Sequence, residues 1–280
     1  MKDIIQNRLD NYYEKKTPED ELNALKEITQ EVALYALYKV GFFEKACFIG
    51  GTCLRIVHDL DRFSEDLDFS TRSTAMDFNL DMYLEKAMVV MKPYGYDLNI
   101  DDKDLNDKSV QGRFLKDDSI KKVLTFKHRQ DERQKIKIKV EIDTNPPIGA
   151  VEKVEYIGFP EDYSILAYDI PSLMSGKIHA LLCREYSKGR DWYDFSWYVK
   201  NRYVPNLKLL ENALKQLGPW KGEDLHLDES FLKEELLKRV KSLNWPDIKA
   251  DVRKFLRAEQ AQSLELWSLD FFEDKIKKLL

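Results

Sequence analysis

The spacing of hydrophobic and polar positions predicts helices at both ends of the chain. From Thr17 to about Lys39 apolar residues recur at helical spacing, and Thr17-Pro18-Glu19-Asp20 supplies the cap, the proline and the acids of a helix start. Residues 1–15 and 78–93 show similar amphipathic spacing. Beyond Asn201 we expect an all-helical region, with helices at about 206–217, 229–243, 246–258 and 264–279 that Trp220, Trp245 and Trp267 pack together.

Shorter runs between these helices predict strands. Residues 47–49 form an apolar run that ends in a Gly-Gly turn, and residues 66–69 alternate between acids and large apolar residues. Residues 122–127 and 135–143 also alternate, and the polar stretch 128–133 between them predicts a hairpin. Further strands are expected at 96–100 and within 151–168. In the second arm of the hairpin, one face is apolar and the other carries lysines and acids; the apolar set is Ile136, Ile138, Val140 and Ile142.

This order of elements predicts an α+β fold, with a small mixed or antiparallel sheet flanked by helices and an all-helical C-terminal region. We expect a core with N-terminal helices over residues 1–200 and the helical region over residues 201–280. With 43% hydrophobic and 34% charged residues, the 280-residue chain has ample material for a folded core.

Charge and cysteine content exclude some classes of protein. The net charge of −5 argues against a generally basic nucleic-acid binder and leaves room for a local basic cleft. The three cysteines lack C-x-x-C spacing, so neither a disulfide framework nor a zinc knuckle is indicated. Because no apolar run is long enough for a membrane span and no signal-peptide core is visible, we expect a cytoplasmic protein with no membrane partner.

Two carboxylates form the strongest candidate for chemistry. Asp66 and Asp68 alternate with apolar residues on one strand, so both project from one face of the sheet, where hard oxygen ligands can hold Mg²⁺. The upstream Gly50-Gly51 turn, before a helix expected to start near Thr52, lets backbone N–H groups approach a phosphate. Metal and phosphate together indicate phosphoryl or nucleotidyl transfer.

Glu141 is a natural third metal ligand, because its strand can lie beside the Asp66–Asp68 strand. Lys135, Lys137 and Lys139 share its face. These lysines either line a cleft suited to a triphosphate or an RNA backbone, or form an ordinary solvated strand face.

A second group of charged residues lies on two later helices. The helix predicted from Ser172 to about Tyr186 carries Lys177 and Arg184 near one face. The next helix opens at Arg190, with Asp191 and Asp194 three positions apart. Acids in a first turn commonly complement the helix dipole, so this pattern alone has an ordinary structural explanation.

Taken together, Gly50-Gly51-Thr52, Asp66-Leu67-Asp68, Glu141, Lys177 and Arg190-Asp191-Trp-Tyr-Asp194 resemble the AbiEii/AbiGii nucleotidyltransferase toxins. This family is a branch of the DNA polymerase β-like nucleotidyltransferase superfamily, and the similarity spans roughly residues 30–200. Thr52 stands where many relatives have Ser.

The resemblance implies an Mg²⁺-dependent enzyme, with Mn²⁺ as an alternative ion, that transfers a nucleotide from an NTP to an acceptor hydroxyl. It implies metal ligands at Asp66, Asp68 and Glu141, contacts of Gly50, Gly51, Thr52, Lys177 and Arg190 with the nucleotide, and a substrate-positioning role for Asp191. It further implies an RNA acceptor such as a tRNA 3′ end, a cognate antitoxin and a role in phage defence. Two alternatives stay open: a transferase acting on a protein hydroxyl or a small molecule, and a non-catalytic helical binding protein.

Overall fold

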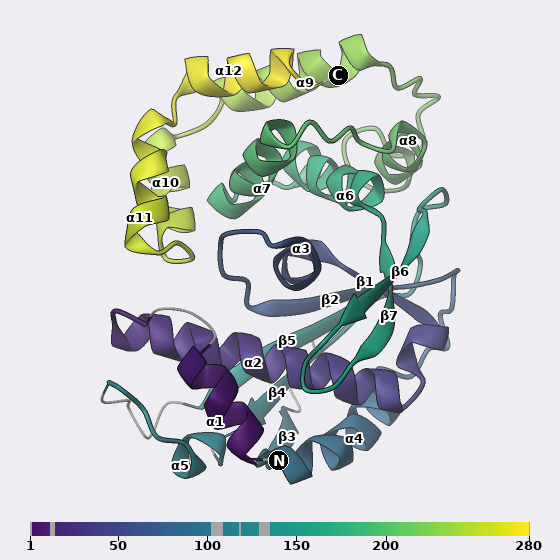
Figure 1. Ribbon diagram of the computed structural model, residues 1–280. Coiled ribbons are helices and arrows are strands. Elements are labelled where there is room, and N and C mark those ends of the chain that lie inside the picture. Colours follow the sequence, from purple (N-terminus) through teal and green to yellow (C-terminus); the bar gives the residue numbers. More distant parts are fainter. Residues whose placement is uncertain (1, 12–14, 102–108, 118, 129–134, 280) are drawn as a thin grey trace. The chain divides into compact units, whose positions relative to one another are not determined.

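The computed structural model describes residues 2–11, 15–101, 109–117, 119–128 and 135–279. Within these residues the strands form one seven-stranded sheet in the order β3-β4-β5-β2-β1-β7-β6 (Figure 1). Both parallel and antiparallel pairs occur, and helices accompany the sheet, which confirms the predicted α+β class. The strands are β1 (Ala46–Ile49), β2 (Asp66–Thr71), β3 (Leu98–Asp101), β4 (Val110–Asp117), β5 (Ile136–Asp143), β6 (Glu152–Ile157) and β7 (Tyr163–Tyr168).

The chain divides into two compact units. Unit 1 consists of Met1–His58, Phe63–Pro146 and Val154–Ala167, and unit 2 consists of Asp59–Arg62, Pro147–Lys153 and Tyr168–Leu280. Along the chain the last change of unit falls at residue 168, and the division into domains at residue 200 stays a prediction. The change falls at residue 168 because the two helices that follow β7 contact the C-terminal helices and so belong to the same unit as those helices.

The helices of unit 1 are α1 (Lys2–Asn11), α2 (Pro18–Lys39), α3 (Gly50–His58), α4 (Leu80–Met91) and α5 (Ile120–Val123), with short 3₁₀ turns at Phe42–Glu44 and Lys92–Tyr94. The predicted start of α2 is confirmed, since Thr17 and Asp20 form a capping box. Helix α2 packs on α4 and β5 (Figure 1). The apolar side chains of β5 are all buried, as their alternation predicted.

The predicted hairpin is wrong in its first arm. Residues 120–123 form the helical turn α5, and the antiparallel partner of β5 is β4, which lies earlier in the chain. The Asp117 carboxylate accepts N–H bonds from Ser119 and Ile120, both at 2.8 Å, and so ends β4 and begins the turn. The alternation of β4 is obscured because Gly112 interrupts it and polar residues occupy both of its faces. Residues 129–133, in the loop predicted to join the two arms of the hairpin, lie outside the described residues.

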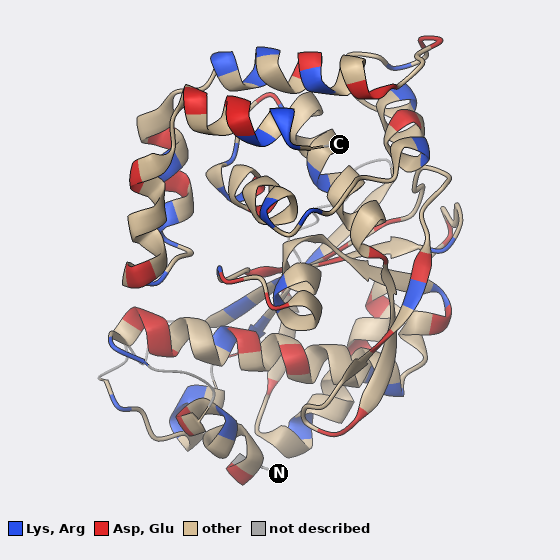
Figure 2. Ribbon diagram, turned by 45° about the horizontal axis from the view of Figure 1, so that its top comes forward, with Lys and Arg blue, Asp and Glu red and all other residues tan. Residues whose placement is uncertain are grey.

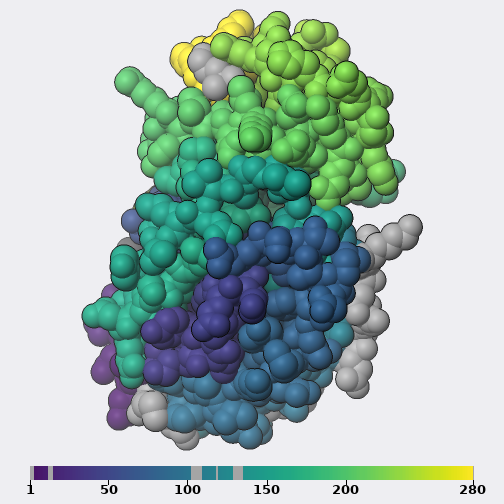
Figure 3. Space-filling model, turned by 90° about the vertical axis from the view of Figure 1, so that its right-hand side faces the viewer, coloured from purple at the N-terminus to yellow at the C-terminus, as the bar shows by residue number. Residues whose placement is uncertain are grey.

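Unit 2 is built from helices: α6 (Ile170–Cys183), α7 (Gly189–Lys200), α8 (Leu207–Gln216), α9 (Glu229–Lys241), α10 (Trp245–Arg253), α11 (Ala258–Ala261) and α12 (Leu269–Lys277), with a 3₁₀ turn at Gln262–Leu266. In the space-filling view the residues coloured light green, which include α9, pack closely against one another (Figure 3). Lysines, arginines and acids alternate along these helices (Figure 2), in part as i,i+4 ion pairs such as Lys233–Glu229.

Aromatic contacts hold the C-terminal helices together, as predicted for the tryptophans. The ring of Trp245 stacks on Phe272 with 5.3 Å between centroids, and Trp267 meets Phe272 edge-on at 5.1 Å. Trp220 packs edge-on against Phe231 at 5.7 Å. In the part of the chain that the structure describes, no helix is both long and apolar enough to cross a membrane.

Candidate active site

The turn between β1 and α3 lies directly against Asp68. Strand β1 runs antiparallel to β2 with Ile49 opposite Asp68, and Gly50 follows at once with a φ of 80°. A Cβ added to Gly50 would lie 2.4 Å from Oδ2 of Asp68 and 2.9 Å from its Cβ. The positive φ and the close approach therefore both require glycine at this position, and they bring the first turn of α3 against a carboxylate.

Helix α3 begins at Gly50, two residues earlier than expected. The N–H groups at its N-terminus are therefore close to the Asp68 side chain, and such groups favour an anion. Thr52 is fully buried and its hydroxyl donates a hydrogen bond to the backbone carbonyl of Asp66. That proton is thus used to fix α3 to the start of β2, and in this conformation Thr52 does not offer it to a phosphate.

Strand β5 brings Glu141 beside the aspartates. It runs parallel to β2, with Glu141 in register with Asp68 and Lys139 in register with Asp66. The expectation that these two strands are neighbours is confirmed. All four side chains are half-buried, and Nζ of Lys139 lies 2.7 Å from Oε2 of Glu141.

The donor chemistry of this strand pair fits a hard divalent cation. Among the described residues no group of three or more His, Cys, Asp or Glu side chains is gathered closely enough to hold a metal by itself. Mg²⁺ does not need such a cage, because it is usually bound by one or two carboxylates, several waters and the phosphates of the substrate. Asp66 and Asp68, adjacent to a helix N-terminus, match that requirement.

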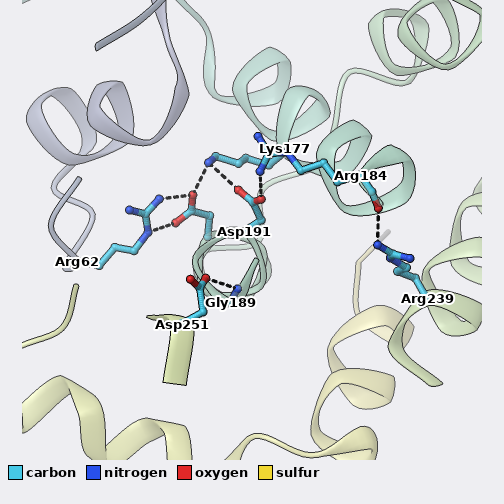
Figure 4. Close-up of polar contacts among 8 residues, drawn as sticks. Arg62, Lys177, Arg184, Gly189, Asp191, Arg239 and Asp251 are labelled. Carbon is cyan, nitrogen blue, oxygen red and sulfur yellow. Dashed lines mark hydrogen bonds and ion pairs between the residues drawn. The ribbon is translucent and has the colours of Figure 1, made fainter. Parts of the chain in front are cut away.

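The second set of candidate residues lies in unit 2, on α6 and α7 (Figure 4). Asp191 and Asp194 occupy the same face of α7, and both are buried. The Nζ of Lys177 lies 3.1 Å from Oδ1 of Asp191 and 2.9 Å from Oδ2 of Asp194. Arg184 pairs with the other oxygen of Asp191. The predicted helix ends at Cys183 and not at about Tyr186, so Arg184 follows α6 with an extended backbone and does not share a helical face with Lys177. Both side chains nevertheless reach the carboxylate of Asp191.

Arg62 completes this network. Its Nε donates to Oδ1 of Asp194 at 2.6 Å and its NH2 group donates to Oδ2 at 2.7 Å. The side chains of Arg62 and Asp194 are 1% and 0% exposed, so this two-point ion pair is withdrawn from water. No local pattern indicates this pair, because its members are 132 residues apart. The three-residue spacing of the two aspartates was the available signal for Asp194.

The charges of the network stabilise one another. Burial alone would raise the pKa of Asp191, but Lys177, Arg184 and Arg62 together hold it below its ordinary value. Burial would likewise lower the pKa of Lys177, but Asp194 and Asp191 raise it. Asp191 is therefore ionised and Lys177 protonated at neutral pH.

The start of α7 is occupied by protein groups. The backbone N–H of Gly189 donates to Oδ2 of Asp251 at 2.8 Å. A Cβ at Gly189 would lie 2.0 Å from the carbonyl oxygen of Ile248, so α10 packs directly on this turn. The guanidinium of Arg190 lies over the Phe255 ring at 5.4 Å from its centroid. Asp251, and not Asp191, satisfies the first N–H of this helix.

The solved structures to which this chain is similar include two proteins from Helicobacter pylori. One is provisionally described as a nucleotidyltransferase (20% identity, 90% of this chain and 96% of that chain covered, TM-score 0.47). The other is JHP933 (19% identity, 90% and 88% covered, TM-score 0.49). A comparison with curated proteins found no significant match.

The family comparison is more informative. A family profile described as "Nucleotidyl transferase AbiEii toxin, Type IV TA system" matches residues 32–274. The resemblance is thereby confirmed, and it extends beyond residue 200 through the C-terminal helices. The chain belongs to the AbiEii nucleotidyl transferase toxins of type IV toxin–antitoxin systems.

Proposed function

We propose that this enzyme transfers a nucleoside monophosphate from an NTP to a hydroxyl of RNA, such as a tRNA 3′ end, in an Mg²⁺-dependent reaction. The observation that carries the proposal is the close approach of Gly50 to the Asp68 carboxylate. Because the first turn of α3 lies against this carboxylate, the N–H groups of that turn would bind phosphate next to the metal ion that Asp68 would hold. An NTP needs both, because its phosphates and their metal ion bind as one group.

Asp66 and Asp68 would hold the ion, with Glu141 as the neighbouring carboxylate on β5. A bound Mg²⁺, or Mn²⁺ in its place, supplies neutralisation of phosphate charge and a lower pKa for the attacking hydroxyl. The N–H groups of Gly50 and Gly51 would bind phosphate oxygens. Glu141 can take part once its contact with Lys139 is exchanged, which leaves Lys139 available to the phosphates.

In unit 2, we assign to Lys177 a contact with the phosphates of the nucleotide. An ammonium group has three N–H donors. Asp191 and Asp194 accept from two of them, and within the described part of the chain the third has no protein acceptor. The side chain is 14% exposed, so it is not completely withdrawn from solvent. Asp191 orients Lys177 and Arg184, and Arg190 is a further cation of the same turn.

The polar face of the sheet supports RNA as the acceptor. On the face that carries Asp66, the register of β4 and β5 places Phe114 opposite Lys139 and Lys116 opposite Lys137. Nζ of Lys137 lies 3.5 Å from the centroid of the half-buried Phe114 ring. An aromatic ring among lysines is the combination by which proteins stack bases and bind a nucleic-acid backbone.

The test offers α-labelled NTPs, with Mg²⁺, to total RNA, to a protein extract and to a small hydroxylated antibiotic in parallel. We expect label in RNA, released pyrophosphate, and loss of both on addition of EDTA. Label in protein or in the small molecule would replace the RNA assignment. Absence of metal-dependent NTP binding by calorimetry would favour a non-catalytic binding protein.

The matched variants are Asp66→Asn and Asp77→Asn. Both exchange a carboxylate for an amide, but Asp77 is exposed and lies outside β2. Asp66→Asn should reduce transfer by about a thousandfold or more with an unchanged circular dichroism spectrum, since the metal loses a charged ligand. Asp77→Asn should behave as wild type. Equal rates for the wild type and Asp66→Asn would refute the site assignment.

A cell-based measurement tests the partner. The family consists of toxins of type IV toxin–antitoxin systems. Induction of the gene should therefore arrest growth, co-expression of the cognate antitoxin should restore it, and Asp66→Asn should abolish the arrest.

A further inference from the structure

We propose that Arg62 is a positioning residue of the transfer reaction, which acts through Asp194 to hold the ammonium group of Lys177 in place for the nucleotide. The inference rests on the proposed function in one respect, the contact of Lys177 with phosphate. It concerns residues of unit 2 alone.

The geometry gives Asp194 a single orientation. Arg62 contacts both of its oxygens, at 2.6 and 2.7 Å, and a two-point contact fixes the plane of a carboxylate as well as its position. Oδ2, which accepts from Arg62, lies 2.9 Å from Nζ of Lys177. Any rotation of Asp194 would therefore move the acceptor of Lys177.

Lys177 depends on this acceptor because its stem is flexible. A lysine ammonium is a point charge on four rotatable carbons, and neighbouring acceptors select its position. Asp191 supplies one anchor at 3.1 Å and Asp194 supplies the other. With two N–H groups directed to these oxygens, the direction of the third N–H is set, and that donor is the one assigned to the nucleotide.

Arg62 also sets the charge of the network. Three cations, Arg62, Lys177 and Arg184, face the two carboxylates, so with every group ionised these five side chains carry one surplus positive charge. Without Arg62 the carboxylates would balance the two remaining cations. An anionic phosphate would then meet a neutral cluster in place of a positive one.

An ion pair that only stabilises the fold affects stability alone, whereas an ion pair that also positions a substrate-binding group affects the kinetics toward the substrate as well. Arg8 supplies the structural comparison, since it pairs at 2.5 Å with Glu31, a carboxylate that is 3% exposed in unit 1. Arg62→Gln and Arg8→Gln each remove a guanidinium from a buried carboxylate, and both should lower the stability of the fold. On our inference only Arg62→Gln changes the kinetics toward NTP.

The experiment is a double-mutant cycle measured as kcat and KM for NTP. Arg62→Gln should raise KM for NTP by about tenfold or more, as expected when a binding group is displaced by a fraction of an ångström. In the Lys177→Gln background the effect of Arg62→Gln on kcat/KM should be much smaller than in the wild type, because only the loss of the Arg62 charge remains once Lys177 is gone. Arg62→Lys, which keeps the charge, should lie between wild type and Arg62→Gln.

Additive effects of Arg62→Gln and Lys177→Gln would overturn the inference, and so would a KM for Arg62→Gln equal to that of Arg8→Gln. If Arg62→Gln does not fold, the double variant Arg62→Gln with Asp194→Asn removes the uncompensated carboxylate as well. It should fold and still show the raised KM. A wild-type KM in that folded double variant would also overturn the inference.

Calorimetric titration with NTP separates this inference from the proposed function. If the wild type binds NTP without transferring a nucleotide, the proposed function fails, and the same cycle in Kd still decides the role of Arg62. If transfer occurs and the cycle is additive, the proposed function stands and the inference fails. If the wild type neither binds nor transfers, both fail.

Discussion

Replacing Gly50 with alanine tests the central feature of unit 1, the contact between the β1–α3 turn and Asp68. Alanine at a φ of 80° costs roughly 1–2 kcal/mol, because the left-handed region disfavours a Cβ. The new Cβ would also lie 2.4 Å from Oδ2 of Asp68, which must turn away. Forcing that side chain off its rotamer adds about 1 kcal/mol. We therefore expect a destabilisation of about 2–3 kcal/mol.

Gly41 provides the control for backbone strain. It has a φ of 76° and lies in the same unit, but a Cβ there would approach nothing closer than 3.5 Å, the distance to Oε1 of Glu44. Gly41→Ala should therefore cost only the backbone term of about 1–2 kcal/mol. Urea unfolding of the two variants, followed by circular dichroism, measures the difference between them. That difference is the cost of displacing Asp68.

The kinetic consequence separates the two variants further. If Asp68 holds the metal ion as proposed, displacing its carboxylate by about an ångström costs about a hundredfold in rate, so Gly50→Ala should lose transfer while still folded. Gly41→Ala should retain wild-type transfer. If Gly50→Ala were no less stable than Gly41→Ala and equally active, the described contact between Gly50 and Asp68 would not control the position of that carboxylate.

Two further predictions concern stability. Burial raises the pKa of Glu31 to about 7 despite the opposing effect of Arg8, whereas the unfolded value is 4.5. The folded state thus holds this proton more tightly, so the contribution of Glu31 to stability is full below about pH 4.5 and is lost as the pH rises through about 7. Urea unfolding curves recorded at a series of pH values should show this fall in unfolding free energy for the wild type and not for Glu31→Gln. The same pH dependence in both proteins would contradict the prediction. Phe272 is fully buried and contacts Trp245 and Trp267. Phe272→Ala should cost about 3–5 kcal/mol of unfolding free energy, and a loss below about 1 kcal/mol would show that these rings do not form the core of unit 2.

Local sequence patterns predicted the structure correctly where contacts between residues near one another in the chain determine it. The alternation of β5 predicted which of its side chains are buried, and the cap at Thr17 predicted the start of α2. The same reasoning failed at β4. Its alternation is not visible because Arg113 and Lys116 lie on opposite faces, and Arg113 is tied to Asp81 of α4 by an ion pair of 2.8 Å. A tertiary contact of that kind allows a charged residue on the inner face, and the sequence pattern does not reveal it.

The two aspartates of α7 show where a local pattern stops being decisive. An acid in a first turn complements the helix dipole, and this explanation fits Asp191 equally well from sequence alone. In the structure, Asp251 accepts from the N–H of Gly189, while both oxygens of Asp191 are engaged by Lys177 and Arg184. Lys177 lies on α6, whereas Arg184 follows the last residue of that helix with an extended backbone, so helical spacing does not explain why both reach Asp191. A local pattern therefore does not reveal which carboxylate these cations bind. The contact of Arg62 with Asp194 has no local spacing at all, because the two residues are 132 positions apart.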